Sequence, residues 1–130
     1  MKVVIAGIRY QDPVEKIIYD DYPFVVKAVM QSGFEITEVI SGHAIGVDRL
    51  GETYASVNNI PLEVKPADWN RFGKAAGPMR NKVMAELCDA AVIIWDGKST
   101  GTYNMVQCMN KLKKPYHLVI TSGSVEDFMK

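Results

Sequence analysis

Five short, almost wholly apolar runs recur along the chain, and segments with helical spacing separate them. This alternation is typical of a parallel β-sheet whose two faces are both covered by helices. We therefore predict an α/β fold, with residues 1–130 forming a single Rossmann-like domain. Its five-stranded, mainly parallel sheet would carry helices on both faces. The predicted strands are residues 3–6, 36–40, 61–64, 90–95 and 116–120.

Helices are predicted between these strands. An apolar stripe over residues 24–30 follows Pro23, which suits a helix start, and ends at Ser32-Gly33, which suits a helix end. Residues 12–19 are ambiguous and could form a separate helical turn. Apolar spacing predicts the remaining helices over residues 47–57, around Val83, Met84 and Leu87 with Pro78 in the first turn, over 105–112, and over 124–129.

Composition narrows the class of protein. Lys and Arg number 15, as do Asp and Glu, so the formal net charge is zero and binding to nucleic acid is not expected. No apolar run is long enough to span a bilayer, and the first ten residues lack the plan of a signal peptide, so a cytoplasmic protein without membrane contact is expected. Cys88 and Cys108 are predicted to be free thiols inside helices. With only two histidines, we expect no metal centre and no cofactor.

In such a sheet, right-handed crossovers bring the loops that follow the strands to one edge, where open α/β sheets bind ligands. Ser99, Thr100, Gly101 and Thr102 follow the most apolar run and open a helical segment. The first N–H groups of a helix lack partners, and the helix dipole favours negative charge there. This turn therefore predicts an anion site.

A second turn of the same design runs from Ser41 to Asp48. Gly42 and Gly46 would let backbone N–H groups converge on an anion. Asp48 is either a helix cap or a partner for a ribose hydroxyl, and His43 is either a base contact or a surface histidine. Because no Gly-Lys-Ser/Thr sequence ends the turn, it is not a P-loop. Two anion-binding turns in one domain suggest a phosphate-bearing ligand such as a nucleotide.

Two further loops carry cations beside aromatic residues. After the first strand, Gly7 permits a tight turn, Arg9 could bind phosphate and Tyr10 could stack on a base. This is not the G-x-G-x-x-G fingerprint of a dinucleotide site. Residues 65–78 are predicted to be a long irregular loop in which Trp69 and several cations would contact a nucleotide. In the alternative interpretation, its aromatic residues anchor the loop to the core.

These motifs together resemble the SLOG superfamily of Rossmann-like domains, which is related to the LOG phosphoribohydrolases and to DprA-like domains. The resemblance is closest to the YspA-type, cpYpsA-related group of bacteria and their phages. It is carried, in order, by residues 7–10, 41–48, 66–69, 73–81 and 95–102. It implies a homo-oligomer that binds a nucleotide or nucleotide-derived ligand as a sensing, sequestering or regulatory module. The residues expected to contact this ligand are Gly7, Arg9, Tyr10, Ser41, Gly42, His43, Gly46, Asp48, Trp69, Arg80, Asn81, Ser99, Thr100, Gly101 and Thr102.

The LOG enzymes supply an alternative function, release of a base from a nucleoside monophosphate. Residues 80–84 resemble their R-K-x-x-M element, with Arg80 at the position of the catalytic arginine and in the first turn of a helix. The position of their catalytic glutamate is Met105, and a methionine can neither stabilise an oxocarbenium ion nor activate water. The N-glycosidase hypothesis therefore requires a carboxylate from Asp48, Asp68 or Asp96. Asp68 is the first choice, with a loop cap as its alternative role.

Overall fold

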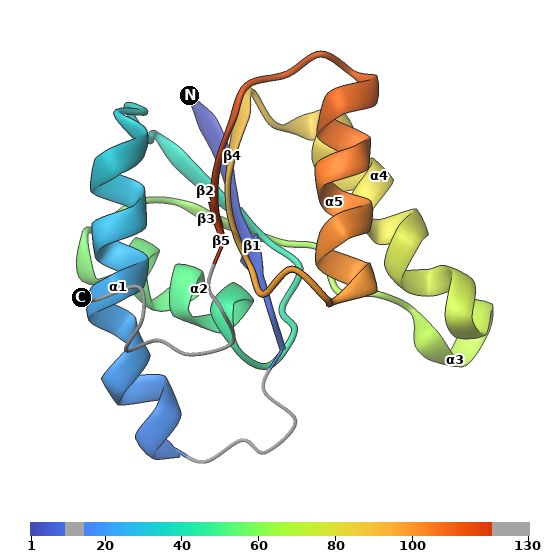
Figure 1. Ribbon diagram of the computed structural model, residues 1–130, viewed down its shortest axis with the longest axis horizontal. Coiled ribbons are helices and arrows are strands. Elements are labelled where there is room, and N and C mark those ends of the chain that lie inside the picture. The colour runs from blue at the N-terminus through green and yellow to red at the C-terminus, as the bar shows by residue number, and fades with distance from the viewer. Residues whose placement is uncertain (10–14, 121–130) are drawn as a thin grey trace.

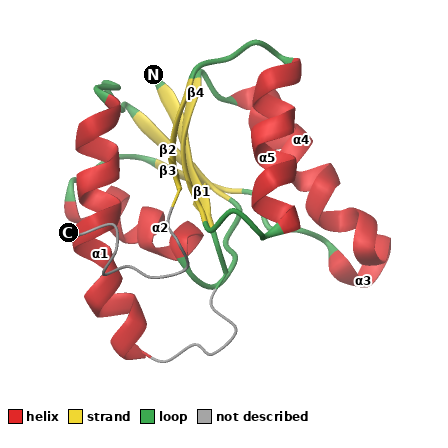
Figure 2. Ribbon diagram, viewed as in Figure 1, coloured by secondary structure: helices red, strands yellow, loops and turns green. Residues whose placement is uncertain are grey.

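The computed structural model describes residues 1–9 and 15–120, and of residues 15–21 only the backbone. Its centre is a five-stranded sheet in the order β3-β2-β1-β4-β5, in which every neighbouring pair is parallel (Figures 1 and 2). The α/β Rossmann-like fold predicted from the sequence is thus confirmed. The strands are β1 (Lys2–Gly7), β2 (Glu38–Ser41), β3 (Leu62–Val64), β4 (Ala90–Trp95) and β5 (Tyr116–Ile120).

Helices cover both faces of this sheet, as the alternating pattern predicts. Helices α1 (Glu15–Ser32) and α2 (Val47–Val57) lie on one face, and α4 (Ala76–Leu87) and α5 (Thr100–Lys111) lie on the other (Figure 1). Helix α3 (Trp69–Phe72) and the short 3₁₀ turn η1 (Gly73–Ala75) lie beside the start of α4. None of the helices described here combines the length and the apolar character needed to cross a membrane.

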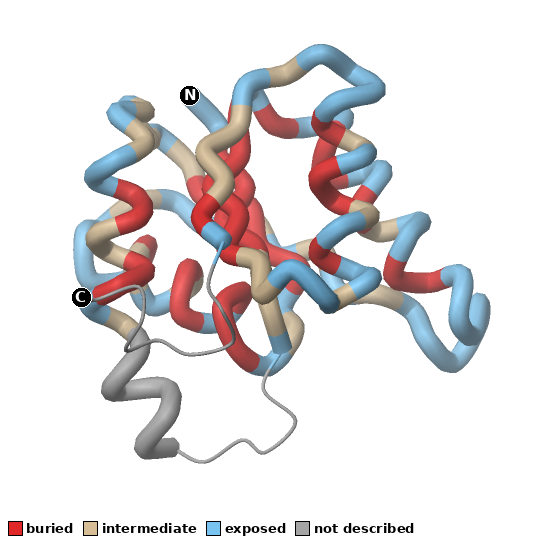
Figure 3. Tube along the Cα trace, viewed as in Figure 1, coloured by how far each residue is buried: buried red, intermediate tan, exposed pale blue. Residues whose placement is uncertain are grey.

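Two hydrophobic cores follow from the alternation of side chains along each strand. In β1, Val3 and Ile5 pack against α1 and α2, whereas Val4 and Ala6 face α4 and α5. Figure 3 shows buried positions running along the sheet and on the sides of the helices that face it. Because β1 and β4 are apolar on both faces, they form the rigid centre from which the loops extend. Fully buried side chains that complete the two cores include Phe24, Leu50, Met84, Met105 and Met109.

The prediction that a helix starts at Pro23 is wrong. Helix α1 begins at Glu15 and contains Pro23 in its interior, although a proline there costs about 3 kcal/mol. The side chains that follow it, Phe24 and Val25, are fully buried, and this packing outweighs the local preference. The predicted helix end is confirmed, because Gly33 follows with a left-handed φ of 71°. Residues 12–14 and the helix predicted over residues 124–129 lie outside the described residues.

The prediction that residues 65–78 form one irregular loop is also wrong. The segment contains α3, η1 and the start of α4, and Asp68 Oδ1 accepts the backbone N–H of Arg71 at 3.2 Å to cap α3. Because η1 continues directly into α4 at Ala76, Arg80 lies beyond the first turn in which the sequence places it. Pro78 does lie in that first turn, as predicted.

The apolar spacing of α4 misidentified part of its buried face. Val83 and Leu87 are 43% and 39% exposed, whereas Met84 and Ala85 pack in the core. The buried side of the first turns is built from small residues and from Asn81, which a pattern of large apolar residues does not reveal. The amide nitrogen of this polar residue bonds to Gly101 and Asn104 of α5.

Candidate functional site

A cleft opens at the carboxyl edge of the sheet, beside the ends of β1 and β4. The neighbouring strands β1 and β4 lead to helices on opposite faces, so their carboxyl ends diverge there. The cleft has a volume of about 890 Å³. Of the residues that the sequence singles out, those that line it are Gly7, Arg9, His43, Asp48, Trp69, Arg80, Asn81, Ser99, Thr100, Gly101 and Thr102.

The other predicted site residues do not line the cleft. Ser41, Gly42 and Gly46 are buried behind its wall. Asp68 is exposed on α3, where its carboxylate serves as the helix cap. Tyr10 lies outside the described residues. The predicted residues thus come together from the loops after β1, β2 and β4 and from α3 and α4, while Asp68 stands apart.

Gly7 allows the close approach on which the cleft depends. A Cβ at this position would lie 2.5 Å from the carbonyl oxygen of Ile94 and 2.9 Å from Cβ of Val47. Any side chain would therefore push β1 away from β4 or from α2. The backbone N–H of Gly7 donates to Oδ1 of Asp48 at 3.3 Å, which ties the end of β1 to the first turn of α2.

Asp48 carries a buried carboxyl group at the floor of the cleft. Only 5% of the residue is exposed, and its Oδ2 accepts the N–H of Ala44 at 3.2 Å. Burial raises the pKa of this carboxyl to about 6, although Arg80, the two backbone hydrogen bonds and Arg9 act in the opposite direction. It is the one carboxyl group among the described residues that line the cleft.

Hydrogen bonds within the turn around Asp48 occupy backbone amides of the second predicted anion site. The N–H of Ala44 donates to Asp48, that of His43 donates to Ser41 Oγ at 3.1 Å, and that of Val47 donates to the carbonyl of Ile8 at 3.2 Å. The sequence predicts that amides of this turn hold a phosphate. At these three positions the amides are already occupied, because side chains and a carbonyl of the protein fill the turn.

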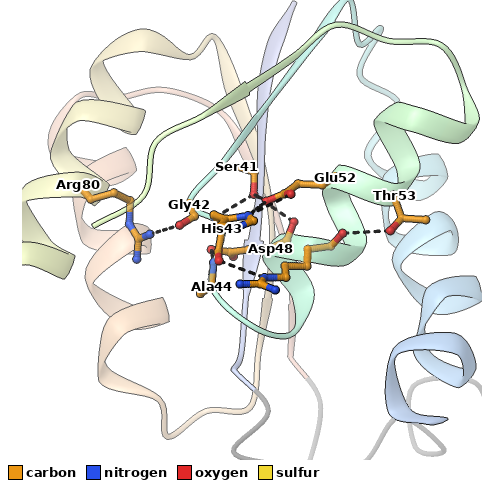
Figure 4. Close-up of polar contacts among 9 residues, drawn as sticks. Ser41, Gly42, His43, Ala44, Asp48, Glu52, Thr53 and Arg80 are labelled. Atoms are coloured by element: carbon orange, nitrogen blue, oxygen red, sulfur yellow. Dashed lines mark hydrogen bonds and ion pairs between the residues drawn. The ribbon is translucent and has the colours of Figure 1, made fainter. Parts of the chain in front are cut away.

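Arg80 reaches from α4 to the same turn. Its Nη1 donates to the carbonyl oxygen of Gly42 (Figure 4), and its Nε donates to Oδ1 of Asn81 at 2.9 Å. Gly42 is required for this contact, because a Cβ there would overlap the guanidinium group and lie 2.8 Å from Asp48 Oδ2. Burial lowers the pKa of the Arg80 guanidinium. The charge of Asp48 acts in the opposite direction, and the charge of Arg9 lowers the pKa further.

Asn81 connects Arg80 to the first turn of α5. Its amide nitrogen donates to the carbonyl of Gly101 at 3.2 Å and to Oδ1 of Asn104 at 3.0 Å. The amide nitrogen thus joins α4 to α5, while the amide oxygen of the same side chain accepts from Arg80 within α4. The guanidinium group and the helix N-terminus are therefore held beside each other.

The turn before α5 is ordered by Asp96. Its Oδ1 accepts the N–H groups of Lys98 and Ser99 at 2.8 and 2.7 Å, and its Oδ2 accepts the Ser99 hydroxyl at 3.0 Å. Burial alone would raise the pKa of Asp96, but these hydrogen bonds outweigh it and lower that pKa. The Ser99 hydroxyl therefore does not cap α5. Within the described residues, the N–H groups of positions 100–102 have no partner, and all three positions line the cleft.

An aromatic ring borders the cleft on the side of α3. Arg9 lies over Trp69, with 5.0 Å between Cζ and the centre of the ring, which is the geometry of a cation–π contact. The ring also packs on α4, since a Cβ at Gly77 would lie 3.1 Å from it. The sequence pairs cations with aromatic residues here, and the structure places this pair at the cleft.

The charge of the cleft differs from that of the chain. Four cationic side chains line it, those of Arg9, Arg49, Lys74 and Arg80, against the single carboxyl of Asp48. The chain as a whole is neutral. A locally positive cleft favours an anionic ligand.

Sequence reasoning missed Glu52, which holds His43 in place. Nδ1 of His43 lies 2.8 Å from Glu52 Oε2, and the same oxygen lies 2.8 Å from the hydroxyl of Ser41 (Figure 4). One signal could have found it, because Glu52 follows Asp48 by one helical turn and so faces the same side of α2. Arg49, whose Nε donates to the carbonyl of His43 at 3.3 Å, was also not singled out.

Comparisons with protein-family models, with curated proteins and with solved structures found no match to this chain. The resemblance to the SLOG superfamily stays a prediction from the sequence motifs. The geometry of the cleft therefore carries the functional proposal.

Proposed function

We propose that the protein binds a nucleotide or nucleotide-derived ligand in this cleft, as a sensing, sequestering or regulatory module of the SLOG type. One observation carries the proposal. The free N–H groups at the start of α5 lie beside the guanidinium group of Arg80, and Asn81 holds the two together. Amides at a helix N-terminus and an arginine fork both suit a phosphate group.

The remaining parts of the cleft support a nucleotide over a simple anion. The volume of about 890 Å³ lies within the range of small-molecule sites, about 300–1,000 Å³. Trp69 offers a ring on which a base could stack, and Arg9 supplies a second cation next to it. Phosphate would lie at residues 100–102 and Arg80, and the base would lie toward α3.

Calorimetric titration tests this proposal with mono-, di- and cyclic nucleotides and ADP-ribose derivatives. Loss of the charged hydrogen bonds in Arg80→Met should cost about 2–3 kcal/mol, or about 30- to 150-fold in Kd. Arg71→Met is the matched control, because Arg71 rests on Phe72 outside the cleft. Equal affinity of the two variants, or no binding of any nucleotide to the wild type, would contradict the proposal. Sedimentation of the same samples measures the self-association that the resemblance implies.

A second candidate, hydrolysis of an N-glycosidic bond, is favoured by the position of Asp48. This carboxyl lines the cleft near Arg80, whereas Asp68 caps α3 and Asp96 orders the turn before α5. Asp48 is thus the carboxylate that could stabilise an oxocarbenium ion in place of the LOG glutamate, whose position Met105 occupies here. Chromatography of nucleoside monophosphate reactions would detect the free base. Activity should be lost in Asp48→Asn and kept in Asp68→Ala; the reverse pattern would eliminate this assignment.

A further inference from the structure

Two guanidinium groups are anchored to the backbone at and next to His43. Arg80 donates to the carbonyl of Gly42, and Arg49 donates to the next carbonyl along the chain, that of His43 itself. All three side chains line the cleft. An anionic group drawn to these two arginines would therefore lie next to the imidazole ring.

Glu52 determines which nitrogen of that ring is available. A carboxylate can only accept hydrogen bonds, so the short contact with Glu52 keeps a proton on Nδ1. Nε2 then carries the lone pair of the neutral ring, and it has no partner among the described residues. Glu52 is itself fixed by the Ser41 hydroxyl, and its side chain is only 18% exposed.

The backbone at His43 supports a functional role for this ring. Its φ of 63° lies in the left-handed region, which residues other than glycine seldom adopt. Such conformations persist where the surroundings impose them, and they concentrate at functional sites. Here the turn amide, the carbonyl and the ring of His43 are each held by a different partner: Ser41, Arg49 and Glu52.

We propose that His43 and Glu52 form a general-base dyad that hydrolyses a phosphoanhydride bond of a bound nucleotide. This rests on the proposed function and adds a reaction to it. The lining of the cleft offers two sets of donors to phosphate: the amides of residues 100–102 with Arg80, and the guanidinium groups of Arg49 and Arg80. A ligand with two linked phosphates would occupy both and would place one phosphorus atom beside Nε2 of His43.

The step balances without a redox partner. Nε2 takes a proton from water while the water oxygen forms a bond to the phosphorus. The bond from phosphorus to the bridging oxygen breaks, and its electron pair leaves with that oxygen, which regains the proton from the imidazolium. ADP and water would give AMP and inorganic phosphate; ADP-ribose would give AMP and ribose 5-phosphate. The guanidinium groups of Arg49 and Arg80 would stabilise the charge in the transition state.

The test is turnover of ADP and ADP-ribose, with AMP as the nucleotide that lacks the bond. His43→Asn suits the left-handed backbone and should lower kcat by about 10²- to 10⁴-fold while KM changes little. Free imidazole should restore turnover to His43→Gly, a response that a purely structural histidine would not produce. Glu52→Gln, a change at a positioning residue, should lower kcat by about 10- to 100-fold. Arg71→Met should match the wild type.

The failures of the two proposals are distinguishable. Binding of ADP by the wild type without formation of AMP overturns the dyad and leaves nucleotide binding intact. Turnover that survives in His43→Asn, or His43→Gly that imidazole does not restore, also overturns it. Release of free adenine in place of phosphate would point to glycosidic cleavage and reject the dyad as a phosphoanhydride hydrolase. Absence of binding for every nucleotide would overturn both proposals.

Discussion

Asp48 should make the protein less stable at neutral pH than in mild acid. The pKa of its carboxyl rises from 3.8 to about 6 on folding because the group is buried. Between these values the folded protein binds a proton that the unfolded chain releases. The stability that protonation gives is therefore fully present below the unfolded pKa and is lost as pH rises through the folded one. At about 1.36 kcal/mol per pH unit the full effect is about 3 kcal/mol, of which about 2 kcal/mol falls between pH 4.5 and 7.

Replacement of Asp48 by Asn removes this titration. Urea unfolding of both proteins over pH 4.5–7.5 gives the difference in free energy of unfolding at each pH. The variant should gain about 2 kcal/mol relative to the wild type between pH 4.5 and 7. Its absolute stability also includes the contacts of the new amide with the N–H donors of Gly7 and Ala44. The change with pH isolates the burial of the charge.

Asp96→Asn provides a control with the opposite sign. Hydrogen bonds lower the pKa of Asp96, so the stability it contributes is present at neutral pH and is lost as pH falls through that lowered value. Its variant should therefore keep a constant difference from the wild type over pH 4.5–7 and gain on it only as the pH falls below 3.8, whereas Asp48→Asn loses on the wild type as the pH falls from 7 to 4.5. A flat difference for Asp48→Asn between pH 4.5 and 7, or a gain on acidification, would refute the reasoning.

Three other substitutions test separate parts of the structure. Gly42→Ala should displace the guanidinium of Arg80 and weaken nucleotide binding about tenfold or more by calorimetry, with native circular dichroism; unchanged affinity would contradict the packing. Trp69→Leu should weaken binding of a nucleotide by about 5- to 150-fold yet leave the affinity for inorganic phosphate unchanged, since stacking contributes about 1–3 kcal/mol per base; an equal loss for both would contradict a base at this ring. Lys114→Met removes a side chain that donates to three carbonyls at the end of α4 and should lower the free energy of unfolding by about 1.5–3 kcal/mol, against little change for the exposed Lys111→Met; equal effects would show that these bonds do not contribute.

Much of the fold could be predicted from the sequence because the central strands β1 and β4 are buried on both faces. Such strands are apolar along almost their whole length, so each appears as a continuous run, and the more exposed β3 and β5 are indicated by shorter apolar stretches between turns. The predicted second strand, residues 36–40, begins two residues before β2, because Ile36 is apolar but precedes the strand. The start of α1 could not be found, since the packing of Phe24 and Val25 overrides the proline between the two halves of the helix.

The candidate site was predictable in its location and less so in its details. Parallel strands bring their following loops to one edge, so the turns at Gly7, His43 and Ser99 could be grouped from chain order alone. The use of the second turn could not be foreseen, because the carboxylate of Asp48 fills it from within. Nor could the pairing of His43 with Glu52, which depends on the way α2 packs against β2.

The most direct measurement is the mapping of amide shifts by NMR as AMP is added to the labelled protein. The account predicts that the largest changes fall on the amides of residues 100–102, with further changes at Gly7 and at the indole of Trp69. The side chain of Arg80 should shift as well, because it lies beside those amides. Shifts that concentrate on the outer surface of α4 and α5, around Lys82 and Lys111, would contradict the assignment of the ligand to this cleft.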